Sequence, residues 1–157
     1  MRHRTPTAPP NALTPSVVAD ARVLALEVAG LEPTAPIEPS SVGVVAEPGE
    51  RVLRVTSLWV RWLVDGIWSQ AHRSECLVTD RRLVARLPAA GLTSFWWGSL
   101  VGLDVDLHAG HVILDYGDGR PRALAGEGIA LAAVAAIAAA YGVEALATHH
   151  AIEPLRS

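Results

Sequence analysis

The sequence contains no lysine and only one cysteine, Cys76. Because lysine is absent, all 13 basic residues are arginine, a bias that suggests a GC-rich bacterial genome. The bias also weakens any argument that a given arginine was selected over lysine for bidentate contacts. A single cysteine excludes an internal disulfide and favours a reducing compartment. We interpret Cys76 as a small buried hydrophobic residue.

The chain also lacks excess basic charge and long apolar runs. Its net charge of −3 gives no support to a nucleic-acid partner. The uncharged run 128–143 is mostly alanine and is shorter than the ~20 residues of a membrane span. No apolar run of signal-peptide length follows Arg2, His3 and Arg4, so we expect a cytoplasmic protein.

No motif for catalysis, metal binding or phosphate binding stands out. Two histidines without further ligands at suitable spacing are a weak metal signal, and paired carboxylates on one strand face are more typical of a solvated edge. The glycine pairs fit turns, because no phosphate-loop or nucleophile-elbow motif occurs. The residues considered are Asp104 and Asp106, His108 and His111, His149 and His150, Gly117 and Gly119, and Gly126 and Gly128. We predict no catalytic, cofactor or metal site.

With 157 residues, of which 50% are hydrophobic, the chain is long enough for one domain with a core of its own. Thr14, Pro15 and Gly30 are a plausible cap, first position and end of an amphipathic helix. The expected segments are a disordered terminus at 1–13, a helix at 14–30, a proline-rich linker at 31–47, a domain at 48–142 and a tail at 143–157. The linker could hold an edge strand at 42–46, and we expect a loose end after Pro154.

Within the domain, apolar alternation and turn residues predict a chain of antiparallel strands. Residues 75–87 form a predicted hairpin with its turn at Asp80 and Arg81, because Asp suits a turn and branched apolar residues flank it. The other expected strands are 51–64 (one bent strand or two), 67–68, 103–107, 111–116 and 120–124. A final helix is predicted at 128–141, with Gly142 as its cap. Its apolar stripe is expected to hold Leu131, Val134, either Ile137 or Ala138, and Tyr141.

Charged and aromatic side chains in this region set further conditions. Arg81, Arg82 and Arg86 cannot all be buried without partners, so some must face water or meet an acid. Adjacent Trp96 and Trp97 point to opposite faces if the segment is extended, which leaves one of them at the surface. We interpret most of the five tryptophans as packing in the core or at a barrel rim; the other three are Trp59, Trp62 and Trp68.

Several segments in order resemble bacterial pleckstrin-homology-like (PH-like) and GRAM-type domains. Gly49–Leu53 resembles their opening strand, and Leu77–Val84 resembles their Thr-Asp-x-Arg-Leu hairpin. Trp97–Leu103 and Val134–Gly142 are similar to a later strand and the closing helix. The resemblance covers about 48–142. It implies an α+β, mainly β fold: a seven-stranded, partly open antiparallel barrel closed by a C-terminal helix, here with an extra N-terminal helix.

The same resemblance implies binding of proteins, peptides or lipids without chemistry. The leading hypothesis is a non-catalytic intracellular adaptor for a protein or peptide partner. The first alternative is weak binding to an anionic membrane surface, with Phe95–Trp97 inserting beside Arg81, Arg82 and Arg86. Only Arg73 lies where phosphoinositide-binding members cluster basic residues, which counts against that alternative. The second alternative is a small-molecule carrier or enzyme that uses the barrel mouth.

Overall fold

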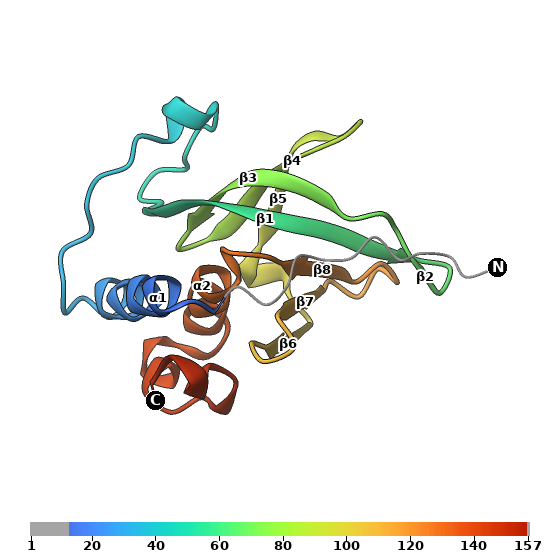
Figure 1. The fold of residues 1–157 in the computed structure, drawn as a ribbon. Coiled ribbons are helices and arrows are strands. Elements are labelled where there is room, and N and C mark those ends of the chain that lie inside the picture. Colours follow the sequence, from blue (N-terminus) through green and yellow to red (C-terminus); the bar gives the residue numbers. More distant parts are fainter. Residues whose placement is uncertain (1–12, 157) are drawn as a thin grey trace.

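The computed structural model describes residues 13–156 (Figure 1). The predicted disordered segment, 1–13, lies outside these residues apart from Leu13. The helices are α1 (Pro15–Val28) and α2 (Ile129–Tyr141), with short 3₁₀ helices η1 (Pro39–Val42), η2 (Trp97–Ser99), η3 (Val143–Ala147) and η4 (His150–Leu155). The strands are β1 (Val52–Val64), β2 (Ile67–Trp68), β3 (His72–Thr79), β4 (Arg82–Leu87), β5 (Gly91–Trp96), β6 (Gly102–Asp106), β7 (His111–Asp115) and β8 (Arg122–Ala125).

One curled antiparallel sheet forms the body, with strand order β5-β4-β3-β1-β8-β7-β6 and β2 paired to the end of β1. The long strand β1 joins the two halves, because it pairs with β3 along one edge and with β8 on the other from Trp59 to Trp62. A register shift between Val52 and Arg54 marks a bulge at its start. The expected mainly β, antiparallel sheet with one N-terminal and one C-terminal helix is confirmed. The expected number of strands, seven, is wrong: within residues 13–156 the sheet has eight, and β5 was not among the strands expected from the sequence.

Helix α2 is the centre of the core. Its residues from Ile129 to Ile137 are all buried, because the sheet covers one side and α1 and η3 cover others. A helix that is apolar on every face is expected to be buried all round. The predicted single stripe is therefore wrong at its end, where Tyr141 is 54% exposed. Gly128 precedes the helix, and a Cβ there would lie 2.5 Å from Thr56 Cγ2.

Helix α1 packs on the body. Thr14 caps it by accepting the Val17 N–H at 3.3 Å, as the sequence predicts, and Ala21 and Leu24 are buried against α2. Buried Glu27 pairs with the Arg54 guanidinium of β1. The helix is thus fixed to the sheet by both apolar and charged contacts.

The proline-rich segment 31–47 loops out from the end of α1 and returns to the start of β1, with η1 along its course (Figure 1). The edge strand expected at 42–46 is wrong: η1 ends at Val42, and Gly43 has a φ of +77°, which strand pairing does not use. Val44 instead packs in a small apolar cluster with Val52, Leu77 and Val84. Along β3, Leu77 alternates with core residues, so this cluster lies on the face of the sheet opposite α2.

The C-terminal segment also packs on the body. Ile152 and Leu155 of η4 are buried, and η4 contacts α1. The loose end expected after Pro154 is therefore wrong for Leu155. Together α1, η3 and η4 form a second layer outside α2.

Candidate functional site

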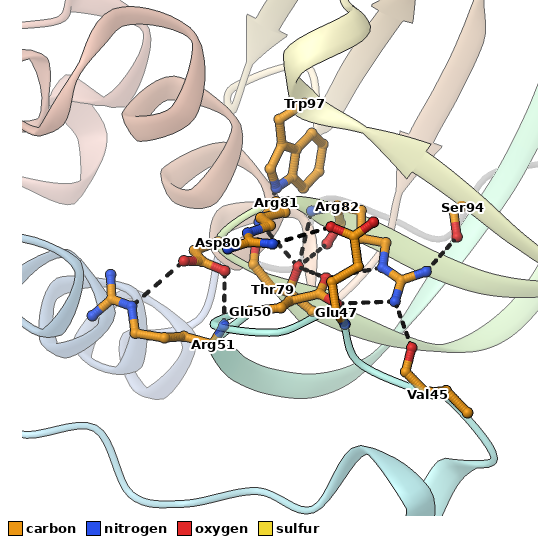
Figure 2. A network of polar contacts seen from close by, with 10 residues as sticks. All are labelled: Val45, Glu47, Glu50, Arg51, Thr79, Asp80, Arg81, Arg82, Ser94 and Trp97. Atoms are coloured by element: carbon orange, nitrogen blue, oxygen red, sulfur yellow. Dashed lines mark hydrogen bonds and ion pairs between the residues drawn. The ribbon is translucent and has the colours of Figure 1, made fainter.

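A buried ion pair joins the proline-rich segment to the β3–β4 hairpin. The Arg82 guanidinium of β4 donates to both carboxylate oxygens of Glu50, each at 2.9 Å. Its remaining N–H groups donate to Ser94 Oγ and to the Val45 carbonyl, also at 2.9 Å. Only 11% of the Arg82 side chain and none of the Glu50 side chain is exposed. Glu50 therefore holds the segment 45–50 against the hairpin (Figure 2).

Thr79 connects this pair to the turn of the hairpin. Its hydroxyl donates to Glu50 Oε2 at 2.7 Å and accepts the N–H groups of Arg81 and Arg82 at 3.0 and 2.9 Å. Its carbonyl accepts the indole N–H of Trp97 at 3.1 Å. The turn is thus fixed from both sides, by the acid of an earlier segment and by a later tryptophan (Figure 2).

The ion pair has a marked effect on protonation. Burial alone raises the pKa of Glu50, but hydrogen bonds from Arg82, the Glu47 N–H and Thr79, with the charge of Arg82, lower it to about 2. The same hydrogen bonds to Glu50 raise the pKa of Arg82. Both groups stay charged at neutral pH, and each satisfies the other where little water reaches.

A hollow of about 650 Å³ opens beside this network. It lies between the β3–β4 turn, η2 and the last turn of α2. Its lining is one aromatic wall with charged and small polar neighbours: Glu47, Asp80, Arg81, Trp96, Trp97, Gly98, Ser99 and Ala139. We call it the Trp96 hollow. Arg81 and Glu47 pair at its rim at 3.0 Å, and both remain 40–50% exposed.

Trp96 is held in place from several directions. The Arg82 guanidinium lies 4.7 Å from the centre of its ring. The backbone carbonyl of Trp96 accepts a hydrogen bond from the Tyr116 hydroxyl at 3.1 Å. The next residue, Trp97, is buried. Trp96 itself is half-buried, so the tryptophan that was expected at the surface is only partly exposed. A fixed, partly exposed indole is a preorganised contact residue, since little side-chain entropy is lost when it is covered.

Four of the other candidate residues, Asp104, Asp106, His108 and His150, line a second hollow of about 650 Å³ between β6 and η4. Asp104 and Asp106 lie toward solvent on β6, and Asp104 faces His111 at 3.6 Å. His149 stacks on His150 and accepts the Ala151 N–H. Burial, with the charges of His150 and Arg156, lowers the pKa of His149. Within residues 13–156, no group of three or more His, Cys, Asp or Glu is arranged to hold a metal ion.

Cys76 is buried in the sheet, as the sequence predicts. Burial raises the pKa of its thiol to about 11, and Ser74 and Leu58 provide hydrogen bonds that only partly offset this. At neutral pH the residue is a thiol and not a nucleophile.

The remaining tryptophans lie around the other end of β1. Trp62 stacks on His72, and the Arg61 guanidinium lies 4.9 Å from the Trp68 ring. Trp59, Trp62 and Trp68 are all half-buried, so among the tryptophans only Trp97 is a fully buried core residue. The β1–β2 hairpin projects beyond the body, and Ile67 at its tip is 72% exposed.

Sequence reasoning found the aromatic run 95–97 but not the hollow. Glu47, Gly98 and Ala139 are far apart in the chain, and none carries a motif. One signal is present in the sequence: Gly49–Leu53 and Leu77–Val84 both resemble segments of PH-like domains, and the structure pairs them through Glu50 and Arg82.

Comparisons with known proteins add a fold likeness. No family model and no curated protein matches the chain. Among solved structures, a match is the "Vps36 N-terminal PH domain", at 15% identity and a TM-score of 0.44, covering 67% of this chain and 87% of that one. At this identity the similarity concerns the fold alone.

Proposed function

We propose that the protein is a binding module without chemistry of its own, and that the Trp96 hollow takes a segment of a protein or peptide partner. The observation that carries the proposal is a partly exposed indole in the wall of a hollow of about 650 Å³. The Arg82 guanidinium lies over its ring, and Tyr116 holds the Trp96 backbone carbonyl. The assignment to a GRAM-type module belongs to the same proposal and rests on the Thr79–Leu83 motif. A bacterial origin is proposed from the absence of lysine, and a cytoplasmic location from the single cysteine, Cys76.

The composition of the hollow suits a peptide. Tryptophan and arginine are the residues most enriched among those that dominate binding energy at interfaces. Arg81 and Glu47 provide one donor group and one acceptor group at the rim, close to the apolar wall. A partner residue with an apolar body and a polar end would fit this arrangement. Its apolar part would cover Trp96, and its polar end would hydrogen-bond to Arg81 or Glu47 in place of their bond to each other.

The proposal can be tested without disturbing the core. Trp97 is unsuitable, since it is buried and its loss would leave a cavity. Gly98 is better: a Cβ there meets nothing within 4 Å, and its φ is outside the left-handed region. Gly98→Gln places a side chain at the lining of the hollow. The matched control is Ala109→Gln, at an exposed turn between β6 and β7.

The experiment is affinity capture from host lysate with quantitative mass spectrometry, followed by calorimetry with the purified partner. We expect wild type and Ala109→Gln to capture the same partner protein. Gly98→Gln should bind that partner at least tenfold more weakly. Equal binding by all three variants, or no specific protein with wild type, would reject the proposal. Circular dichroism and melting temperature confirm that both variants are folded.

A second candidate function is contact with an anionic membrane surface, and one feature favours it. The run Phe95–Trp97 is not available for insertion, because Phe95 and Trp97 are buried. The tip of the β1–β2 hairpin is available for insertion, because Ile67 is exposed there and the Arg61 guanidinium lies against the Trp68 ring. No helix within residues 13–156 is both long and apolar enough to cross a bilayer. Cosedimentation with phosphatidylserine vesicles at low salt, lost in Ile67→Asp, would support this function; its absence would reject it.

A further inference from the structure

We propose that the free edge of strand β5 pairs with β5 of a second copy of the protein, so that two copies form a weak, two-fold symmetric dimer with one continuous sheet. Strand β5 ends the sheet on one side, next to β4. The proposal rests on the backbone of β5 and does not depend on what the Trp96 hollow binds.

The ladder between β4 and β5 shows which backbone groups of β5 point outward. In an antiparallel pair, residues that exchange hydrogen bonds with the neighbouring strand alternate with residues whose N–H and C=O groups point away from it. Arg86 of β4 lies opposite Leu92, but its N–H is bonded to Ser74 Oγ of β3 at 2.8 Å, on the side away from β5. Leu92 and, at steps of two residues, Ser94 and Trp96 therefore direct their backbone groups to the outer edge.

Two of these three residues have backbone groups without a partner in the fold. The Trp96 carbonyl accepts the Tyr116 hydroxyl at 3.1 Å. The N–H and C=O groups of Leu92 and Ser94 make no hydrogen bond to any group within residues 13–156. Leu92 is 44% exposed and Ser94 is half-buried, so a neighbouring strand can reach both. Their backbone groups thus have the spacing that an added strand requires.

The other edge of the sheet is protected against such pairing. Edge strands usually carry charged residues or proline, or are covered by another element. Strand β6 carries Asp104 and Asp106, and η4 contacts it. Strand β5, with the sequence Gly-Leu-Thr-Ser-Phe-Trp, has no charged residue and no proline. Its edge therefore lacks the features that keep strands of separate molecules apart.

A second copy provides a partner for each of these backbone groups. A two-fold axis at Thr93 places Leu92 opposite Ser94 of the second copy, and Ser94 opposite its Leu92, so that each pair exchanges both N–H···O bonds. The two Thr93 side chains then form a cross-strand pair, and the two Leu92 side chains become diagonal neighbours that cover each other. Because β5 is uncharged, no like charges of this strand meet across the axis.

The pairing is expected to be weak. Stable interfaces bury about 1,200–2,000 Å² in total, and two short strand edges bury less. We therefore expect a dissociation constant of roughly 0.1–1 mM, so that the dimer forms only in concentrated solution.

The test is sedimentation equilibrium of the full-length protein across roughly a hundredfold range of concentration that brackets this dissociation constant, with ¹⁵N spectra over the same range. We expect a monomer–dimer equilibrium in which the amide signals of Leu92 and Ser94 shift with concentration and their exchange with D₂O slows. The Thr93 amide, which faces Ala85 of β4, should exchange slowly at every concentration.

A matched pair of variants locates the interface. Leu92→Lys should weaken the dimer at least tenfold, because two like charges become diagonal neighbours across the axis. Leu31→Lys replaces another exposed leucine, outside the sheet, and should leave the dimer unchanged. Circular dichroism checks that both variants are folded.

Three results would overturn the proposal. They are a protein that remains a monomer over the whole range, a dimer that Leu92→Lys leaves unchanged, and concentration-dependent shifts confined to residues outside β5, such as Ile67 at the β1–β2 tip. If Leu92→Lys does not fold, the wild-type signals of Leu92 and Ser94 still decide, because only pairing through this edge protects their amides.

Discussion

Replacing Glu50 with glutamine should destabilise the protein more than any other single charge removal around the β3–β4 turn. The amide cannot balance the Arg82 charge, and it donates where the carboxylate only accepts. Arg82 is then left buried without its counter-ion, at the point where the segment 45–50 joins the hairpin. Breaking a buried pair from one side typically costs about 3–5 kcal/mol.

The pKa of Glu50 gives a second route to the magnitude. Against an ordinary value of 4.5, folding lowers this pKa to about 2. One pKa unit corresponds to about 1.4 kcal/mol, so ionised Glu50 adds about 3 kcal/mol to the free energy of unfolding. Because the pKa is lower in the folded state, this contribution is complete above pH 4.5 and is lost as pH falls toward 2. The free energy obtained from the pKa therefore agrees with the cost expected for breaking a buried ion pair.

The assay is urea unfolding followed by tryptophan fluorescence, at pH 7 and pH 3, for wild type, Glu50→Gln and Glu47→Gln. Glu47 is the matched control, since its pair with Arg81 is exposed and such pairs contribute about 0–1 kcal/mol. Glu50→Gln should lose about 3 kcal/mol at pH 7 and less than half of that at pH 3. Equal losses for the two variants, or a Glu50→Gln loss that does not shrink with acid, would refute the reasoning.

Three further predictions concern the core. Gly128→Ala should lower the free energy of unfolding by roughly 1–3 kcal/mol, measured by urea unfolding, because the new Cβ would lie 2.5 Å from Thr56 Cγ2; an unchanged midpoint would show that the helix can shift freely. Cys76 should resist Ellman's reagent at pH 8 until the protein unfolds, since burial raises its pKa to about 11; fast labelling of native protein would contradict its placement. Arg54→Met leaves Glu27 buried without its partner and should cost about 3–5 kcal/mol, with earlier proteolysis of α1; a loss below about 1 kcal/mol would mean that α1 is held by apolar packing alone.

Local chemistry explains why much of the sheet was predictable from the sequence. Asp65 and Gly66 both have positive φ, 50° and 77°, as a tight hairpin turn requires, and the pair reads as a turn in the sequence. The Asp80–Arg81 turn and the alternation in 103–107 are similar cases. Each of these features depends on residues close together in the chain, so the local sequence pattern is enough to predict it.

Contacts between distant segments could not be predicted this way. Glu50 and Arg82 are 32 residues apart, and nothing local indicates that the acid turns inward. Val42 and Val44 resemble strand residues, but they pack on the outside of the sheet instead of pairing. For α2, the expected single stripe missed the second layer formed by α1, η3 and η4. The absence of charge from 129 to 137 was the available signal, since a helix with no polar face has no exposed side.

The Trp96 hollow has one part that local sequence predicts and another that depends on contacts between distant segments. The sequence indicates an exposed member of the pair Trp96 and Trp97, because adjacent residues alternate. Which of the two it is depends on the Thr79 carbonyl, which takes the Trp97 indole N–H and draws that ring inward. The hollow itself also needs Glu47 and Ala139, which only the folded chain places beside it.

The measurement that tests the central claim most directly is the ¹⁵N spectrum of the five indole N–H groups during titration with the captured partner. Binding at the Trp96 hollow predicts a large shift for Trp96, little change for Trp97, whose N–H stays bonded to Thr79, and none for Trp68 at the projecting hairpin. A titration that shifts Trp68 and leaves Trp96 in place would contradict the account and move the binding surface to the β1–β2 tip.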